Sequence, residues 1–177
     1  VFSLSDGSVS ALLETVDSAK ARGAETLCRV TGYGMAHGSV PFGKVTGSAA
    51  GLTAAVEAAL DDAHLTASDI DAIVGFANGH SALDAVEAEG LSKCFDLSRV
   101  PVISVKERAG EGRAASATLG LAHAALMLHG DLAEEPDAYL AAADGMKKVG
   151  VKSADLSRIL VVSFAAGGSY TAIVAER

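Results

Sequence analysis

The chain has 177 residues, of which 50% are hydrophobic and 20% are charged, a composition that predicts a folded domain and excludes a disordered chain. Its formal net charge is −8, and its fourteen lysines and arginines are scattered, which argues against a nucleic-acid partner. Nineteen glycines and only three prolines favour closely packed helices and strands, so we expect one domain of the α/β class.

Cysteine usage and hydropathy bear on the compartment. Cys28 and Cys94 fit no disulfide or zinc pattern, and we interpret both as buried small side chains in a reducing compartment. No apolar run is long enough for a membrane span and no signal peptide is visible, so we expect a cytoplasmic protein with no membrane partner, no metal and no other cofactor. The only local basic cluster, Lys147–Lys148, is interpreted as a solvated face. The chain begins at Val1 rather than Met, which suggests a fragment, a processed product or an engineered boundary.

In chain order, strands and helices are predicted to alternate. Residues 8–15 are expected to form a strand that leads into a short polar helix, and this helix ends at Gly23. Residues 26–35 are β-branched and apolar, which predicts a second strand, and a glycine-rich loop follows. From Ala49 to His64, apolar residues recur at spacings of three and four, which is typical of an amphipathic helix.

Two more strands frame the next helix. Residues 70–76 predict a buried strand and residues 100–105 predict the strand after it. Ser81 and Asp84 have the spacing of a capping box, so we expect Ser81 to be the N-cap of a helix that runs to Leu91.

The last third contains an unusual helix. Residues 114–128 contain no charged residue and only His123 is ionisable, so this helix is expected to be buried on all sides, as it would be between two sheets. Residues 131–157 are more polar and are expected to be loop-like with one short helix. Residues 158–176 predict two strands joined by a hairpin at Ala-Ala-Gly-Gly.

Three segments, in this order, resemble the C-terminal half of the β-ketoacyl synthases, the condensing enzymes with the thiolase fold. They read IVGFANGHSALDAVEAEGL (73–91), VISVKERAGEGRAASATLG (102–120) and SFAAGGSYTAIV (163–174), and the opening at 6–34 is similar as well. The resemblance implies a mixed sheet with helices on both faces and one fully buried helix. It implies a single domain, with residues 1–24 as a linking strand and helix and residues 25–177 as the core.

The catalytic positions of this family are altered. The family uses a cysteine in its other half and two histidines that donate hydrogen bonds to an enolate. The resemblance places Phe76 at the first histidine and Glu111 at the second, and a carboxylate repels an enolate. His80 lies four residues too late to take the first role, and a local loop histidine is one interpretation of it. We therefore expect no catalytic residue, with His80 as the weak candidate should the loops rearrange.

The resemblance also implies roles for residues around these positions. Lys106 and Glu87 match a lysine and a glutamate of a buried polar network, and we expect a satisfied ion pair. Phe76, Phe164 and Ala166 are expected to line a tunnel or pocket, because the family often has an aromatic gate at the last of these positions; Phe164 is also a candidate for the core.

The chain length factor is the non-catalytic partner of the ketosynthase in type II polyketide synthases. It keeps the fold of the family but lacks the two histidine donors, and this chain resembles it in both respects. The expected partners are an N-terminal ketosynthase-like half, a catalytic ketosynthase subunit in a heterodimer and, through that subunit, an acyl carrier protein. The missing half would cover the apolar helix at Leu119, Leu121, Leu126 and Leu128. The alternatives are half of an active β-ketoacyl-ACP synthase, which performs decarboxylative Claisen condensation, and a scaffold protein that reuses the fold.

Overall fold

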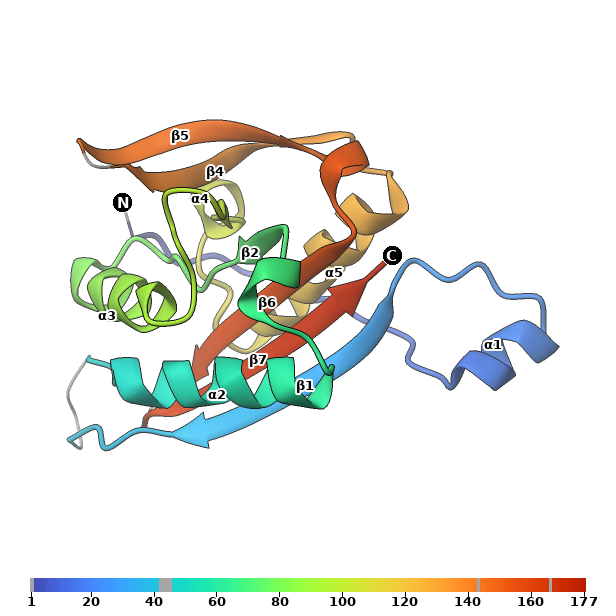
Figure 1. The fold of residues 1–177 in the computed structure, drawn as a ribbon, viewed down its shortest axis with the longest axis horizontal. Coiled ribbons are helices and arrows are strands. Elements are labelled where there is room, and N and C mark those ends of the chain that lie inside the picture. The colour runs from blue at the N-terminus through green and yellow to red at the C-terminus, as the bar shows by residue number, and fades with distance from the viewer. Residues whose placement is uncertain (1, 42–45, 143, 166) are drawn as a thin grey trace.

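The computed structural model describes residues 2–41, 46–142, 144–165 and 167–177. Within these ranges, seven strands form one mixed sheet in the order β1-β7-β6-β2-β3-β4-β5 (Figure 1). The strands are β1 (Arg29–His37), β2 (Ala72–Val74), β3 (Val102–Ile103), β4 (Glu134–Ala142), β5 (Gly145–Lys152), β6 (Arg158–Ala165) and β7 (Ser169–Glu176). The helices are α1 (Val16–Ala21), α2 (Ala49–Asp62), α3 (Ser81–Ser92), α4 (Lys106–Ala109) and α5 (Ser116–His129), with short 3₁₀ turns at Ala67–Asp69, Arg113–Ala115 and Ser153–Asp155.

Helices cover both faces of the sheet. Successive side chains of a strand point to opposite faces, and β6 shows this directly. Leu160 packs with the buried residues of α2, whereas Ile159 and Val161 pack with the buried residues of α5. In Figure 1, α2 lies in front of β7 and β1, and α5 lies behind the sheet. The fold class expected from the sequence is therefore confirmed.

Two glycines of β1 allow α2 to lie close to the sheet. A Cβ atom at Gly34 would lie 2.0 Å from the carbonyl oxygen of Ala55, and one at Gly32 would lie 2.3 Å from that of Ala59. Both contacts are with helix backbone, which cannot move aside as a side chain can. The small residues that the composition suggested are thus used at the contact between α2 and β1.

We expect the substitution Gly34→Val to lower the free energy of unfolding by about 3 kcal/mol or more, because overpacking a rigid contact forces backbone shifts. Chemical denaturation of the purified chain measures this loss. Gly7→Val is the matched control, since a Cβ at exposed Gly7 meets no atom within 4 Å. Equal stability of the two variants would contradict the close packing.

The region 131–157, expected to be loop-like, instead forms the hairpin of β4 and β5. Two of its acidic residues, Glu135 and Asp137, are buried in ion pairs, and charged residues are not expected inside a fold. Glu135 lies 2.6 Å from Arg108, and Asp137 lies 2.6 Å from Lys148. Lys148 is therefore an ion-pair partner, but its side chain is 49% exposed and Lys147 is exposed as well, so both lie on a solvated face as expected.

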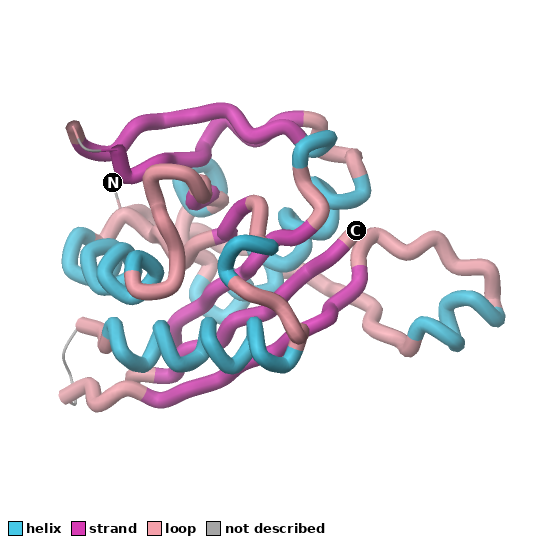
Figure 2. The backbone as a smooth tube through the Cα atoms, viewed as in Figure 1, coloured by secondary structure: helices cyan, strands magenta, loops and turns pink. Residues whose placement is uncertain are grey.

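Two smaller expectations are also corrected. Residues 8–15 form no strand, and Leu12 and Leu13 are 81% and 72% exposed, because no described strand lies beside them. Figure 2 shows α1 carried on loops away from the sheet. The N-cap of α3 is His80 rather than Ser81, because the carbonyl of His80 accepts the hydrogen bond from the Asp84 N–H at 2.9 Å.

Helix α5 is buried on one side only. Leu128 is fully buried against the sheet, whereas Leu119, Leu121 and Leu126 are half-buried. The expectation that this helix is buried on all sides is thus wrong for the described chain. An apolar surface remains on its outer side.

Candidate functional site

Three parallel strands bring the site residues together. β2 pairs in parallel with both β3 and β6, so the carboxyl ends of all three strands lie at one edge of the sheet. Phe76, Lys106 and Phe164 follow or end these strands. The rings of Phe76 and Phe164 stack with centroids 4.7 Å apart and an interplanar angle of 7°. Lys106 Nζ lies 3.4 Å from the Phe76 ring centroid, a cation–π arrangement.

Glu111 is held by several donors. Its Oε2 lies 3.0 Å from Lys106 Nζ, and the two side chains are 7% and 6% exposed, respectively. Ser116 Oγ donates to Glu111 Oε1 at 2.5 Å, and the Arg113 N–H donates to the same oxygen at 2.7 Å. Burial raises the pKa of Glu111, but the hydrogen bonds from Ser116 and Lys106 outweigh it and hold the pKa below its usual value. Burial lowers the pKa of Lys106, and Glu111 opposes this effect.

Glu87 is also buried, with 4% exposure, but its partners are main-chain groups. Its two carboxylate oxygens accept the N–H of Phe76 at 2.5 Å and the N–H of Ala77 at 2.8 Å. Ala77 has a φ of 32°, in the left-handed region, so Glu87 fixes a strained turn after β2. Burial raises the pKa of Glu87 to about 7, although the two N–H groups oppose the shift. An ion pair between Lys106 and Glu87 is expected from the sequence. In the structure, the ion-pair partner of Lys106 is Glu111 instead.

Asn78 forms hydrogen bonds with both Glu111 and His80, and the sequence alone does not predict this role. Its Nδ2 donates to Glu111 Oε2 at 3.3 Å, and its Oδ1 accepts the N–H of His80 at 3.0 Å. Asn78 is buried, and a buried amide needs such partners. The sequence signal for Asn78 is its place beside a glycine in the Phe-Ala-Asn-Gly stretch after a predicted strand.

His80 lies at the edge of the site. It is half-buried, and its ring meets the ring of Phe2 edge-on with centroids 6.2 Å apart. Its Nδ1 is buried and has no hydrogen-bond partner among the described residues. The imidazole is therefore not engaged in the local hydrogen bond that one interpretation of the sequence expected.

The start of the chain lies against Glu111. The Glu111 N–H donates to the Ser3 carbonyl at 2.8 Å, and the Ser5 N–H donates to the Glu111 carbonyl at 3.1 Å. These bonds form an isolated parallel bridge between Leu4 and Glu111. Residues 3–5 thus fix the main chain at Glu111.

The remaining predicted residues lie elsewhere. Ala166 is outside the described residues. Cys28 packs against the α5 side of the core and Cys94 against the α2 side, and both are half-buried rather than buried. Burial raises the pKa of both thiols, which favours the weakly nucleophilic protonated form. Within the ranges described, no group of three or more His, Cys, Asp or Glu residues is arranged to hold a metal ion, and no helix is long and apolar enough to cross a membrane.

The site is thus a set of satisfied hydrogen bonds and one ion pair, without a thiol beside it. Its carboxylates accept hydrogen bonds and its one ammonium is neutralised by Glu111. Among the described site residues, the imidazole of His80 is the group with an unused buried nitrogen. Stabilising a developing oxyanion requires preorganised donors aimed at it. The hydrogen-bond donors described in this site point at Glu111, Glu87 and Asn78, so they are already used by protein acceptors.

Comparison with known proteins identifies the family. Residues 27–135 match the sequence profile of the β-ketoacyl synthase C-terminal domain. A tetracenomycin polyketide synthase ketoacyl synthase beta subunit of Streptomyces glaucescens is 33% identical over 124 residues, which are 70% of this chain and 30% of that protein. A 3-oxoacyl-[acyl-carrier-protein] synthase 2 of Vibrio cholerae is 32% identical over 116 residues, which are 62% of this chain and 27% of that protein.

Solved structures share the fold. The ishigamide ketosynthase/chain length factor superposes with a TM-score of 0.79 at 22% identity, over 92% of this chain and 41% of that chain. The chain therefore spans less than half the length of the relatives it matches. The sheet order, the site at the carboxyl ends of β2, β3 and β6, and the profile match all lead to one conclusion: this chain belongs to the β-ketoacyl synthase family, of which it carries the C-terminal domain.

Proposed function

We propose that this chain is part of a non-catalytic, chain-length-factor-like subunit of a type II polyketide synthase. The observation that carries the proposal is the buried Glu111–Lys106 pair with Ser116. By resemblance, Glu111 stands where the condensing enzymes have a histidine donor. A carboxylate held by four donors cannot stabilise an enolate, because it is itself negative and already accepts hydrogen bonds. Phe76, at the other donor position, carries no polar atom.

The proposed partners follow from the surfaces that this chain leaves apolar. The outer side of α5 keeps Leu119, Leu121 and Leu126 half-buried, and Leu12 and Leu13 are exposed before α1. Exposed apolar patches of this kind mark association sites. We assign them to an N-terminal ketosynthase-like half, with residues 1–24 as the link and residues 25–177 as the core of the second half. A catalytic ketosynthase subunit would then complete a heterodimer, and that subunit would receive the acyl carrier protein.

In this proposal the subunit shapes the tunnel into which the acyl chain grows. Phe76 and Phe164 are the tunnel-lining candidates, and their stacked rings form a rigid apolar wall at the carboxyl ends of β2 and β6. Ala166 remains a candidate from the resemblance alone.

Co-purification and a decarboxylation assay test the proposal. The full-length protein should co-elute with a ketosynthase encoded beside it, and it should show no malonyl decarboxylation above background on its own. A monomer without a partner, or substantial activity of the protein alone, would contradict it.

An active β-ketoacyl-ACP synthase is the second candidate. The unpartnered, buried Nδ1 of His80 favours it, since an imidazole with a free nitrogen can donate or accept a proton. The similarity to a 3-oxoacyl-[acyl-carrier-protein] synthase 2 is compatible with it.

The variant His80→Ala separates the two candidates. In a non-catalytic subunit, the condensation rate of the reconstituted complex is expected to stay within about twofold, because His80 takes no part in chemistry. In an active synthase, loss of a general acid or base lowers kcat by about 100-fold or more. His64→Asn is the control, since His64 is exposed and has a φ of 56°, a conformation that asparagine tolerates.

A further inference from the structure

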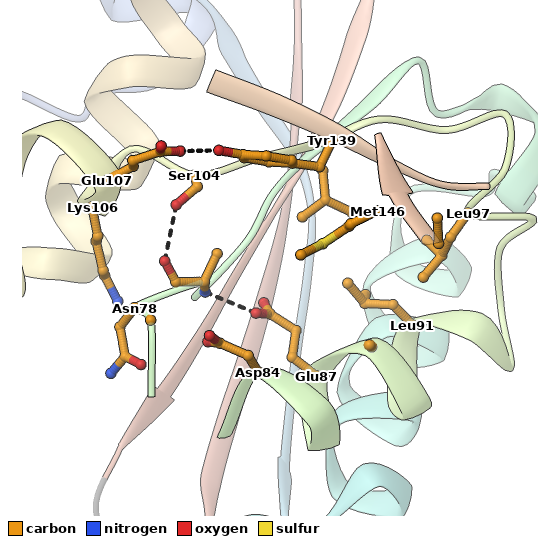
Figure 3. A pocket seen from close by; sticks show the side chains of 15 residues that line it. Asn78, Asp84, Glu87, Leu91, Leu97, Ser104, Lys106, Glu107, Tyr139 and Met146 are labelled. Carbon is orange, nitrogen blue, oxygen red and sulfur yellow. Dashed lines mark hydrogen bonds between the residues drawn. The ribbon is translucent and has the colours of Figure 1, made fainter. Parts of the chain in front are cut away.

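A cavity of about 440 Å³ lies between α3, the carboxyl ends of β2 and β3, and the hairpin of β4 and β5 (Figure 3). This volume is within the range of small-molecule pockets. Phe76 and Phe164, the predicted tunnel residues, are not among the residues that line it. The cavity is therefore distinct from the aromatic stack and depends on the hairpin that the sequence did not predict.

The cavity has an apolar wall. Leu91 from α3, Leu97 from the loop after it and Val102 from β3 form its inner part. Met146, at the tip of the hairpin and 79% exposed, lies at its rim. Methionine is flexible and polarisable, so it suits a rim that must adapt to a bound molecule. These side chains offer an apolar body a place out of water.

Most polar groups of the cavity are already bound to other protein groups. Glu87 accepts two main-chain N–H groups, and Lys106 is paired with Glu111. Ser104 Oγ donates to the carbonyl of Ala77 at 3.0 Å, and the hydroxyl of Tyr139 donates to Glu107 (Figure 3).

Asp84 has one acceptor to spare. It is half-buried and lines the cavity from the first turn of α3; the main-chain N–H groups of Asn78 and Gly79 interact with its carboxyl group, but its Oδ1 is buried without a hydrogen-bond partner among the described residues. A buried acceptor without a partner is costly, so a donor from a ligand would be favourable there. Glu107 is a further acidic side chain of the lining, and its one lysine, Lys106, is already paired with Glu111, so the cavity is unfavourable for anions.

We propose that this cavity binds a small molecule that has an apolar body and one protonated amine, with the amine on Asp84 and the body against Leu91, Val102 and Met146. A molecule with the same apolar body but a carboxylate in place of the amine is repelled by the acidic side chains of the cavity and does not bind there. The proposal is independent of the tunnel role assigned to Phe76 and Phe164.

Three probes with one apolar body test the site: 4-phenylbutylamine, 4-phenylbutanol and 4-phenylbutyrate. Binding to the purified full-length protein is measured by calorimetry. The amine is expected to bind at a single saturable site at least 10-fold more tightly than the alcohol, and the acid is expected not to bind. Equal affinities for amine and alcohol, tighter binding of the acid, or no binding of the amine would each overturn the proposal.

Two variants locate the site. Asp84→Asn should remove the preference for the amine over the alcohol, while Asp61→Asn, at an exposed position of α2, should keep it. Ala88→Trp, which fills the cavity from α3, should abolish binding of both probes, whereas Ala85→Trp, on an exposed position of the same helix outside the lining, should not. Amine binding that survives both Asp84→Asn and Ala88→Trp would place the ligand elsewhere and overturn the proposal.

Discussion

Replacement of Glu111 by alanine is expected to destabilise the chain by about 3–5 kcal/mol, because it leaves the buried ammonium of Lys106 without its partner. The loss is read as a shift of the denaturation midpoint at neutral pH. The exposed pair of Lys93 and Glu89 provides the control. Glu89→Ala should cost less than about 0.5 kcal/mol, since an exposed i,i+4 pair contributes little.

The double variant Lys106→Met, Glu111→Leu completes this test. Replacing both charges by apolar side chains of similar volume is expected to restore most of the stability, because a buried pair contributes little beyond the desolvation of its two ions. Phe76 would also keep an apolar contact in place of its cation–π partner. If the double variant is as unstable as Glu111→Ala, Glu111 stabilises the site through Ser116 and Asn78 instead of through Lys106.

The contribution of Glu87 to stability should fall as the pH rises from about 4.5 to 7, because Glu87 has a pKa of about 7 in the folded chain and an ordinary value of 4.5. The folded state then holds a proton that the unfolded state has lost. The contribution of this group is fully present below pH 4.5 and is lost by pH 7, a change of about 3 kcal/mol.

The variant Glu87→Gln isolates this effect. The difference in unfolding free energy between the unaltered chain and the variant should change by about 3 kcal/mol over this pH range. Glu89→Gln, at an exposed position of the same helix, should leave the pH profile unchanged. Parallel profiles for the unaltered chain and Glu87→Gln would show that Glu87 is ionised in the fold.

Helices and strands whose apolar residues follow one regular pattern could be predicted from the sequence. Helix α2 has apolar residues at spacings of three and four, and the segments of β6 and β7 are apolar runs. All three elements are present in the structure. The hairpin of β4 and β5 was missed because its inward-facing residues, Glu135 and Asp137, are charged. Their partners, Arg108 and Lys148, come from α4 and β5, so only the folded chain reveals that these charges are neutralised.

At the site, the sequence identified the residues better than their contacts. Lys106, Glu111 and Glu87 lie near one another at the carboxyl ends of β2 and β3. Which carboxylate meets Lys106 depends on the loop after α4, where Arg113 takes a φ of 53°, and no periodic pattern encodes that turn. The buried hydrogen bonds of Asn78 could not be predicted for the same reason.

The outermost strand, β5, has a consequence for solubility. β3 pairs with the central strand β2 on one side and with β4 on the other, so its outer edge would be unpaired without the hairpin. β4 and β5 cover that edge, and β5 then presents the exposed lysines Lys147 and Lys152 along its length. Lysines on an outer strand repel a second molecule that approaches in register, which hinders the growth of fibrils from that side.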